Sequence, residues 1–322
     1  LIIQKAMHSA TPKPKIVIVC GPTGIGKTAV VVDMAQRYKG QIIGADSMQI
    51  YKYMDIGTAK PTAEEKARVV HHMVDIVAPD EPFDAARYVK SARRIITQLC
   101  RQQILPFVVG GTGLYIKALL YGLFNDDAYD PHIRAKLKTE AKTHGIEYLH
   151  RRLRRLDPET ANRLHPHDTY RILRALEVAE TTGKAISRHQ REHSFSEQPF
   201  DAFKIGLRME RELLYARINQ RVEAMIAAGF VEEVKSLLSR GYSANLKSMQ
   251  SIGYRHVVDY LERRLTWAEC VRTIKRDHRR YAKRQLTWFN ADPEIVWKTP
   301  DQIEEMIHLV DKFIRADKMG DN

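Results

Sequence analysis

The residues best suited to chemistry stand close together near the N-terminus, in one glycine-rich run. The run reads Gly21-Pro22-Thr23-Gly24-Ile25-Gly26-Lys27-Thr28 and satisfies the pattern GxxxxGK[ST], which is typical of phosphate-binding loops. In such a loop, successive backbone N–H groups and the N-terminus of the next helix face a pair of phosphates. Lys27 would neutralise the far phosphate, and the Thr28 hydroxyl could bind Mg²⁺. The pattern favours a phosphorylated ligand over a bare glycine-rich turn, without saying which ligand.

Two other polar residues follow apolar runs that predict strands. Asp46 ends one such run, and Thr112 stands in Gly110-Gly111-Thr112-Gly113 after another. A nucleoside-triphosphate hydrolase would usually carry a magnesium-holding acid at the end of the latter strand, where this chain has glycines. Asp46 could supply that acid, cap the next helix, or act as a base that faces a substrate across the phosphate pocket. Thr112 could offer its hydroxyl to a ligand or cap a helix.

The elements that position these residues follow from hydrophobic patterning. Apolar, often β-branched runs predict buried parallel strands over 15–20, 41–45 and 104–109. Helical patterns follow over 28–38 and 114–120. This alternation predicts an α/β fold, a doubly wound parallel sheet like that of P-loop proteins. Ligands in such sheets bind at the carboxyl ends of the strands, where the loops described above lie.

The middle of the chain has a different pattern. Strand signals stop near residue 125, and short, charged amphipathic helices are predicted up to about residue 200. We therefore expect an inserted helical domain over 126–200, within a catalytic core formed by 1–125 and 201–322. A short apolar stretch over 203–207 returns the chain to the sheet.

The charge balance favours a polyanionic partner. The chain has 322 residues, with 52 Lys and Arg against 39 Asp and Glu, for a net charge of +13. More than half of this surplus falls in residues 263–290, which hold nine basic and two acidic residues. Tyr281, Trp288 and Phe289 stand among them. A solvated helix face is the other interpretation of this segment.

Several classes of protein are excluded. No apolar run approaches the ~20 residues that span a bilayer, and the apolar start of the chain is too short for a signal peptide, so we expect a cytoplasmic protein. The three cysteines are far apart, without a CxxC pair, which argues against disulfides and a cysteine-rich zinc site. The histidines at 71, 72, 165 and 167 lack the spacing of a metal ligand set. We expect a monomer without a membrane partner.

Several segments together carry a resemblance to a known family. They are GPTGIGKT (21–28), DSMQIY (46–51), MDIGTAKP (54–61), GGTGLY (110–115), RINQR (217–221), SIGYR (251–255) and YAKRQLTWF (281–289). In composition and order they resemble the bacterial tRNA dimethylallyltransferases, over roughly residues 15 to 290. Residues 291–322 have no interpretation beyond a mostly helical tail.

The resemblance implies a particular reaction. A dimethylallyl group would move from dimethylallyl diphosphate to the exocyclic N6 amine of the adenosine on the 3′ side of the anticodon, with Mg²⁺ and without ATP hydrolysis. The glycine-rich loop would then bind the diphosphate leaving group, with Arg221 beside it and Mg²⁺ on Thr28. By the same resemblance, Asp46 is the base that takes the amine proton, and Thr112 orients that amine.

The resemblance also accounts for the basic segments. A base in a folded tRNA loop must leave its stack to react, so the enzyme must hold flanking phosphates and bases. The residues implied to contact tRNA are Asp46, Ser47, Met48, Gln49, Arg134, Tyr170, Arg171, Ile172, Leu173, Arg174, Gln250, Ser251, Ile252, Gly253, Tyr254, Arg255, Lys283, Arg284, Gln285, Leu286, Thr287, Trp288, Phe289 and Asn290.

Two other functions fit parts of the sequence. One is a P-loop kinase of a nucleoside or small metabolite, with residues 126–200 as its lid. The other is a non-catalytic nucleic-acid-binding protein that uses the loop as a switch. The kinase lacks an obvious arginine-rich lid motif, and the switch has no need of Asp46 and Thr112 near the phosphate loop.

Overall fold

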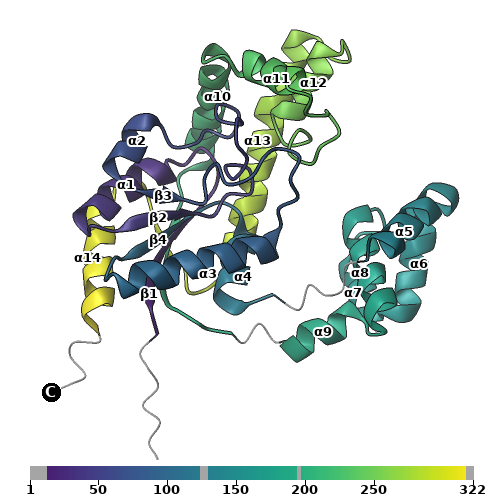
Figure 1. The fold of residues 1–322 in the computed structure, drawn as a ribbon, viewed down its shortest axis with the longest axis horizontal. Coiled ribbons are helices and arrows are strands. Elements are labelled where there is room, and N and C mark those ends of the chain that lie inside the picture. The colour runs from purple at the N-terminus through teal and green to yellow at the C-terminus, as the bar shows by residue number, and fades with distance from the viewer. Residues whose placement is uncertain (1–12, 124–129, 194–196, 317–322) are drawn as a thin grey trace, which may run out of the picture. The chain divides into compact units, whose positions relative to one another are not determined.

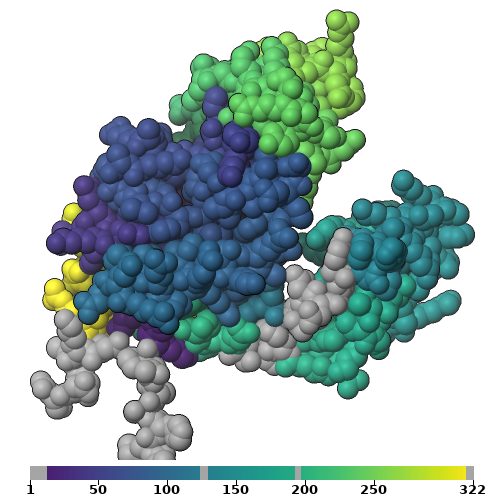
Figure 2. All heavy atoms as spheres, viewed as in Figure 1, coloured from purple at the N-terminus to yellow at the C-terminus, as the bar shows by residue number. Residues whose placement is uncertain are grey.

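The structure is a computed structural model that describes residues 13–123, 130–193 and 197–316. The chain forms two compact units (Figures 1 and 2). Unit 1 comprises 1–120 and 199–322, and unit 2 comprises Tyr121–Gln198. The expected domain boundary at 125/126 lies outside the described residues and stays a prediction.

Unit 1 is built on a six-stranded, all-parallel sheet with the order β3-β2-β4-β1-β5-β6. The strands are β1 (Lys15–Cys20), β2 (Gln41–Gly44), β3 (His71–His72), β4 (Pro106–Gly110), β5 (Asp201–Leu207) and β6 (Val296–Lys298). The predicted α/β fold with a doubly wound parallel sheet is confirmed, including the return of the chain to the sheet at β5. The short edge strands β3 and β6 were not predicted.

The central strand β1 explains why this sheet is stable. Its sequence KIVIVC is buried almost throughout, and it pairs with β4 on one side and β5 on the other. Strands that are buried on both faces need continuous apolar side chains, as this one has. Cys20 ends β1 level with Gly110 of β4 and Gly206 of β5. The carboxyl ends of these strands therefore meet at one edge of the sheet.

Helices cover both faces of the sheet (Figure 1). Those of unit 1 are α1 (Lys27–Arg37), α2 (Ala63–Arg68), α3 (Ala85–Arg101), α4 (Gly113–Tyr121), α10 (Arg211–Ala227), α11 (Phe230–Ser239), α12 (Tyr254–Leu261), α13 (Trp267–Phe289) and α14 (Ile303–Arg315). A buried apolar cluster joins α1, α10, α13 and α14 to the strands. Within 291–316 the tail forms α14 and also supplies β6, so the expected mostly helical tail is confirmed only in part.

Unit 2 is helical. Its helices are α5 (Pro131–His144), α6 (Ile146–Leu156), α7 (Pro158–Arg163), α8 (Thr169–Thr182) and α9 (Ile186–His193). Leu137, Leu153 and Leu176 are fully buried in a common core. Aspartates that accept backbone hydrogen bonds cap α5, α7 and α8, and proline follows the cap in α5 and α7. The helical insertion is therefore specified by local signals in the sequence.

Among the described residues, no helix is long and apolar enough to cross a membrane.

Candidate active site

The phosphate-binding loop joins β1 to α1, as its sequence predicts. Gly24 and Gly26 have φ of 81° and 97°, in the region that favours glycine. A Cβ on Gly24 would also lie 2.8 Å from Cγ1 of Ile218 on α10. Gly26 precedes the first residue of α1 and has no side chain. The first N–H groups of α1 therefore receive no hydrogen bond from a capping side chain. This geometry suits an anion.

Lys27 is the half-buried cation of this loop. Its Nζ donates hydrogen bonds to the carbonyl oxygens of Gly21 at 3.1 Å and Pro22 at 2.9 Å. Burial lowers the pKa of Lys27 to about 8. The Asp46 carboxylate opposes this shift, and the Arg221 guanidinium adds to it. A phosphate beside this ammonium would compensate for its lost hydration.

Arg221 brings a second cation to the loop from α10. Its Nη1 donates to Oγ1 of Thr23 at 3.0 Å. Its Nε is buried without a hydrogen-bond partner in the part of the chain that the structure describes. Burial lowers the pKa of Arg221, with Asp46 opposing, but a guanidinium keeps its charge in proteins. A buried donor of this kind, next to a phosphate loop, favours an anionic ligand.

Asp46 follows β2 and lies near both cations. Its Oδ1 accepts hydrogen bonds from the backbone N–H of Met48 at 2.8 Å and of Gln49 at 3.3 Å. Oδ2 has no hydrogen bond among the described residues. Asp46 therefore caps a tight turn with one oxygen, and the other can act as an acid or base. The sequence left capping and a role as a base as alternatives for Asp46, and this geometry is compatible with both.

Thr112 ties the loop after β4 to the Asp46 turn. Its Oγ1 accepts a hydrogen bond from the N–H of Ser47 at 3.0 Å, and its own N–H donates to the Ala45 carbonyl at 3.1 Å. In this position the threonine side chain holds two loops together and does not cap α4. Asp46 and Thr112, 66 positions apart in sequence, are thus brought to one site.

Gln285 is a bridge that sequence reasoning assigned only to tRNA contact. From α13 its Oε1 accepts from the N–H of Thr23 at 2.8 Å, and its Nε2 donates to the Gly111 carbonyl at 2.9 Å. The side chain is buried, and a Cβ on Gly111 would lie only 2.1 Å from its Nε2. The glycine is thus required by close approach, and Gln285 fixes the phosphate loop relative to the Thr112 loop.

The phosphate-binding loop, Asp46, Arg221 and Gln285 line one cavity of about 400 Å³, whereas Thr112 is not among its lining residues. Its lining includes Thr23, Gly24, Gly26, Lys27, Thr28, Asp46, Gln49, Gly110, Arg217, Arg221 and Gln285. A larger groove of about 870 Å³ adjoins it and shares Arg221 and residues 59–62 with it. Residues 59–61 belong to the 54–61 segment, which the sequence marked only as part of a family resemblance.

The residues expected to contact tRNA divide by exposure. On α13, Lys283, Arg284, Thr287 and Trp288 are exposed, as is Asn290 after it. The buried members are Ile172, Leu173, Gly253, Tyr254, Gln285 and Phe289. Each of these buried residues packs within its own unit, and Gln285 among them also lines a cavity. Contact between the expected residues and tRNA stays a prediction.

In unit 2, three of the expected contacts form one cluster. The Arg134 guanidinium lies 5.2 Å from the centre of the Tyr170 ring, which is 71% exposed. Arg134 and Arg174 both pair with the buried Glu177, at 3.1 Å each. Arg171 is exposed and pairs with Asp168. This cluster presents a basic, aromatic surface on unit 2.

The basic segment 263–290 is partly self-neutralised. Arg255, Arg276 and Arg280 surround the Asp277 carboxylate, at 2.6, 2.9 and 3.8 Å. Although burial opposes ionisation, these partners lower the pKa of Asp277 to about 2. Some arginines of the segment are thus paired within the protein and others remain at the surface, and both interpretations of the segment stay predictions.

The fold and site define a P-loop α/β protein whose phosphate cavity also holds a carboxylate. Known proteins narrow this class. A family model for IPP transferase matches residues 49–292, and one for isopentenyl transferase matches residues 14–75. A tRNA dimethylallyltransferase of Desulfosudis oleivorans is 52% identical over 307 residues, which is 95% of this chain and 98% of the relative. Its counterpart in Geobacter sulfurreducens is 48% identical, over 95% of this chain and 99% of the relative.

Solved structures that are similar to this chain indicate the same family. The tRNA isopentenylpyrophosphate transferase of Bacillus halodurans superposes with a TM-score of 0.71 and 39% identity, covering 95% of this chain and 98% of the other. A eukaryotic dimethylallyltransferase acting on tRNA gives a TM-score of 0.80 at 27% identity, covering 94% and 80%. The chain belongs to the family of tRNA dimethylallyltransferases, and it is an enzyme, a prenyltransferase.

Proposed function

We propose that this protein transfers a dimethylallyl group from dimethylallyl diphosphate to the exocyclic N6 amine of the adenosine 3′ to the anticodon in tRNA. Its family membership supports the reaction class. The observation that carries the finer assignment is that Lys27, Arg221 and Asp46 line one cavity. Two cations suit a departing diphosphate, and the carboxylate suits the amine that replaces it.

The leaving group is handled by the phosphate loop. As the bond between the first carbon of the dimethylallyl group and the diphosphate oxygen breaks, the electron pair stays on that oxygen. Backbone N–H groups at the start of α1, together with Lys27 and Arg221, stabilise this charge. They sit in a partly buried cavity, where such contacts are stronger than in water.

The nucleophile is handled by Asp46 and Thr112. The adenine amine is weakly nucleophilic because its lone pair is delocalised into the ring. As nitrogen bonds to the carbon, its proton passes to Oδ2 of Asp46, which the turn at Met48 and Gln49 orients through Oδ1. Thr112 orients the amine through the loop that it fixes.

Mg²⁺ fits the oxygen donors of the cavity. The Thr28 hydroxyl lines it, and the described residues contain no cluster of three His, Cys, Asp or Glu that would hold a metal ion unaided. A magnesium ion here would be held through the Thr28 oxygen and otherwise through substrate phosphate and water. When bound, the ion would neutralise charge on the diphosphate.

The tRNA would be held by the exposed basic residues described above. Lys283, Arg284 and Trp288 offer charge and a stacking surface on α13, and the Arg134–Tyr170 cluster offers the same on unit 2. We expect the protein to act as a monomer in the cytoplasm.

One assay tests the reaction. The protein is incubated with bulk tRNA and Mg²⁺, with radiolabelled dimethylallyl diphosphate in one arm and labelled ATP in the other. We expect only the dimethylallyl label to become acid-precipitable and to appear in a modified adenosine after nuclease digestion. Transfer of phosphate from ATP to a small molecule would favour a kinase, and no transfer from either donor would favour a binding protein.

A further inference from the structure

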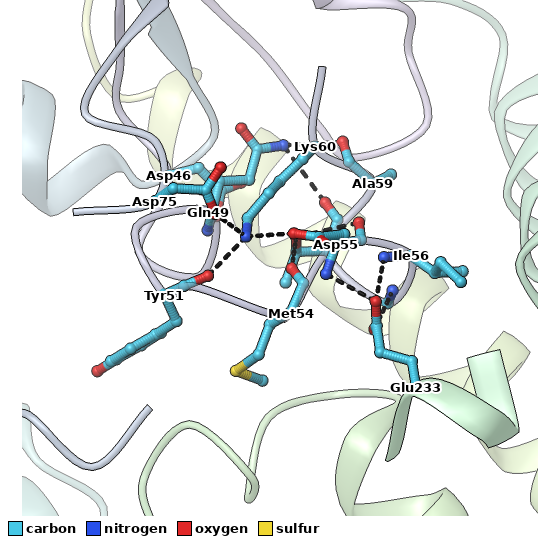
Figure 3. A network of polar contacts seen from close by, with 12 residues as sticks. Asp46, Gln49, Tyr51, Met54, Asp55, Ile56, Ala59, Lys60, Asp75 and Glu233 are labelled. Atoms are coloured by element: carbon cyan, nitrogen blue, oxygen red, sulfur yellow. Dashed lines mark hydrogen bonds and ion pairs between the residues drawn. The ribbon is translucent and has the colours of Figure 1, made fainter. Parts of the chain in front are cut away.

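A carboxylate that the sequence did not single out holds the loop between β2 and α2. Glu233 lies on α11, and its Oε2 accepts hydrogen bonds from the backbone N–H of Asp55 at 2.8 Å and of Ile56 at 2.7 Å (Figure 3). Its Oε1 accepts from the N–H of Gly57 at 3.1 Å and from the hydroxyl of Tyr254 at 2.6 Å. One side chain thus binds three successive amides some 177 residues away in sequence.

These amides need an outside acceptor. The loop forms a tight turn in which the N–H of Ala59 donates to the Ile56 carbonyl at 3.0 Å and that of Lys60 to the Asp55 carbonyl at 3.1 Å. As at the start of a helix, the first N–H groups of such a turn have no acceptor within it. A carboxylate placed against them satisfies the donors and complements their partial positive charge.

Packing fixes the same loop on α11 and α12. A Cβ on Gly57 would lie 2.2 Å from the Phe230 ring and 2.6 Å from the Tyr254 ring, so the backbone lies directly on these side chains. The two rings meet edge to face, with centres 5.0 Å apart. Glu233 therefore receives its hydrogen bonds in a site where the loop cannot shift without a clash.

The other side of the loop is held by a buried lysine. The Lys60 side chain is only 3% exposed, and its Nζ donates to the Tyr51 carbonyl at 2.6 Å and to the Asp55 carboxylate at 2.6 Å. It also pairs with Asp75 (Figure 3). Because a buried ammonium needs all of its partners, this cluster resists partial rearrangement.

From this loop, direct contacts lead to the proposed base. Nε2 of Gln49 donates to the carbonyl oxygens of Ala59 at 3.0 Å and Thr58 at 3.3 Å, and the Gln49 N–H donates to Oδ1 of Asp46. Residues 59–62 line both cavities, whereas Glu233 is not among the lining residues of either. Glu233 thus supports the site without reaching it.

We propose that Glu233 is a positioning residue, which holds the 54–61 loop so that the cavity wall and Asp46 keep the geometry that transfer requires. This inference rests on the proposed function. The test separates a local effect on the loop from a loss of overall stability.

The test compares Glu233→Gln with Glu232→Gln. In Glu233→Gln an NH₂ group meets backbone donors, so the loop loses part of its support. Glu232 is an exposed neighbour on the same helix whose carboxylate lies 3.7 Å from Lys235, which makes it the matched control. The measurements are kcat, KM for each substrate, thermal stability, and hydrogen exchange of the amides of residues 55–57.

We expect Glu233→Gln to lower kcat by about 10-fold or more, as misplaced catalytic groups do, with the KM for tRNA changed less than about twofold. The loop amides should exchange faster while those of β1 and β4 keep their protection. Glu232→Gln should match the wild type. An unchanged kcat in Glu233→Gln, or a fall in kcat with faster exchange throughout the sheet, would overturn the proposal.

If Glu233→Gln does not fold, Tyr254→Phe removes only the hydroxyl hydrogen bond to Glu233 and keeps the ring packing. The same local changes should appear at smaller size, and wild-type kcat and exchange would refute the role of Glu233. A wild type that is inactive on tRNA would contradict the proposed function alone. In that case the affinity for inorganic diphosphate tests the role of Glu233. If Glu233 positions the loop, the variant should bind diphosphate more weakly than the wild type.

Discussion

We propose two tasks for Asp46, one for each of its carboxylate oxygens. Oδ1 caps the turn at Met48 and Gln49, and Oδ2 has no hydrogen bond within the described residues. A purely structural aspartate would be served as well by asparagine, which keeps the Oδ1 acceptor. A base would not, because an amide cannot take a proton at neutral pH.

For this reason the first prediction pairs Asp46→Ala with Asp46→Asn. Both should lower kcat by roughly 10² to 10⁴, the range for lost general-base catalysis, while tRNA affinity changes little. Steady-state kinetics and a tRNA-binding titration on the same preparations check this. Wild-type turnover by Asp46→Asn would leave Asp46 with the capping role only.

Lys27 gives a prediction on pH. Its pKa is lowered by burial to about 8, so its ammonium loses its proton in a range where an ordinary lysine stays charged. A bound diphosphate favours the charged form. Affinity for inorganic diphosphate should therefore fall as the pH rises above 8, by up to about tenfold per pH unit.

Calorimetric titration of the wild type and Lys27→Arg between about pH 7 and about pH 9 checks this, because arginine stays charged and the ligand's own titration is common to both. Parallel profiles would mean that Lys27 does not control binding.

The folded protein binds fewer protons at Lys27 than the unfolded chain does between pH 8 and 10.5, so the contribution of Lys27 to stability rises with pH there.

Single residues also show where sequence reasoning stops. Lys27 and Thr28 could be placed from a local pattern, because the loop, its strand and its helix are contiguous. Gln285 and Glu233 could not be given their roles, because their partners are backbone groups 174 and more residues away. The sequence around a backbone amide does not indicate which distant side chain will form a hydrogen bond with it.

At the scale of elements, the predictable ones are those with a strong local pattern. The strand β1 was predicted with its observed ends because its apolar run is buried on both faces. The strands β3 and β6 hold only two and three residues, His71–His72 and Val296–Lys298, and none of them is fully buried. They form because a neighbouring strand offers an edge, which no local pattern predicts.

The helix α13 combines support and surface. Gln285 and Phe289 face inward, while Lys283 and Arg284 are exposed. Neutralising the exposed pair to alanine should raise the KM for tRNA and lower the slope of log affinity against log salt by up to ~2, since each lost phosphate contact releases about one fewer counterion. A salt titration of tRNA binding measures the slope.

The matched control removes the same charge elsewhere in the basic segment, by alanine at Arg263 and Arg264. Arg264 already pairs with Asp259 and Glu262, so this change should affect the slope less. Equal slopes in the wild type and the Lys283 and Arg284 variant would mean that this part of α13 is a solvated face that does not bind tRNA. An equal decrease in both double variants would indicate a general charge effect.

At the scale of the whole molecule, two units share the basic surplus of a chain whose net charge is +13. Unit 1 carries the phosphate cavity, and unit 2 carries the Arg134–Tyr170 cluster. The α/β class and the helical insertion follow from the order of patterns along the chain. The assembly of the cavity from β2, β4, α1, α10 and α13 does not, because it depends on packing between distant segments.

We propose that the phosphate loop holds a leaving group and not a nucleotide. The decisive measurement is inorganic diphosphate release alongside label transfer, with tRNA, dimethylallyl diphosphate and Mg²⁺ and without ATP. We predict equimolar diphosphate and modified adenosine, with release that depends on tRNA. Diphosphate release without tRNA modification, or modification that requires ATP, would contradict it.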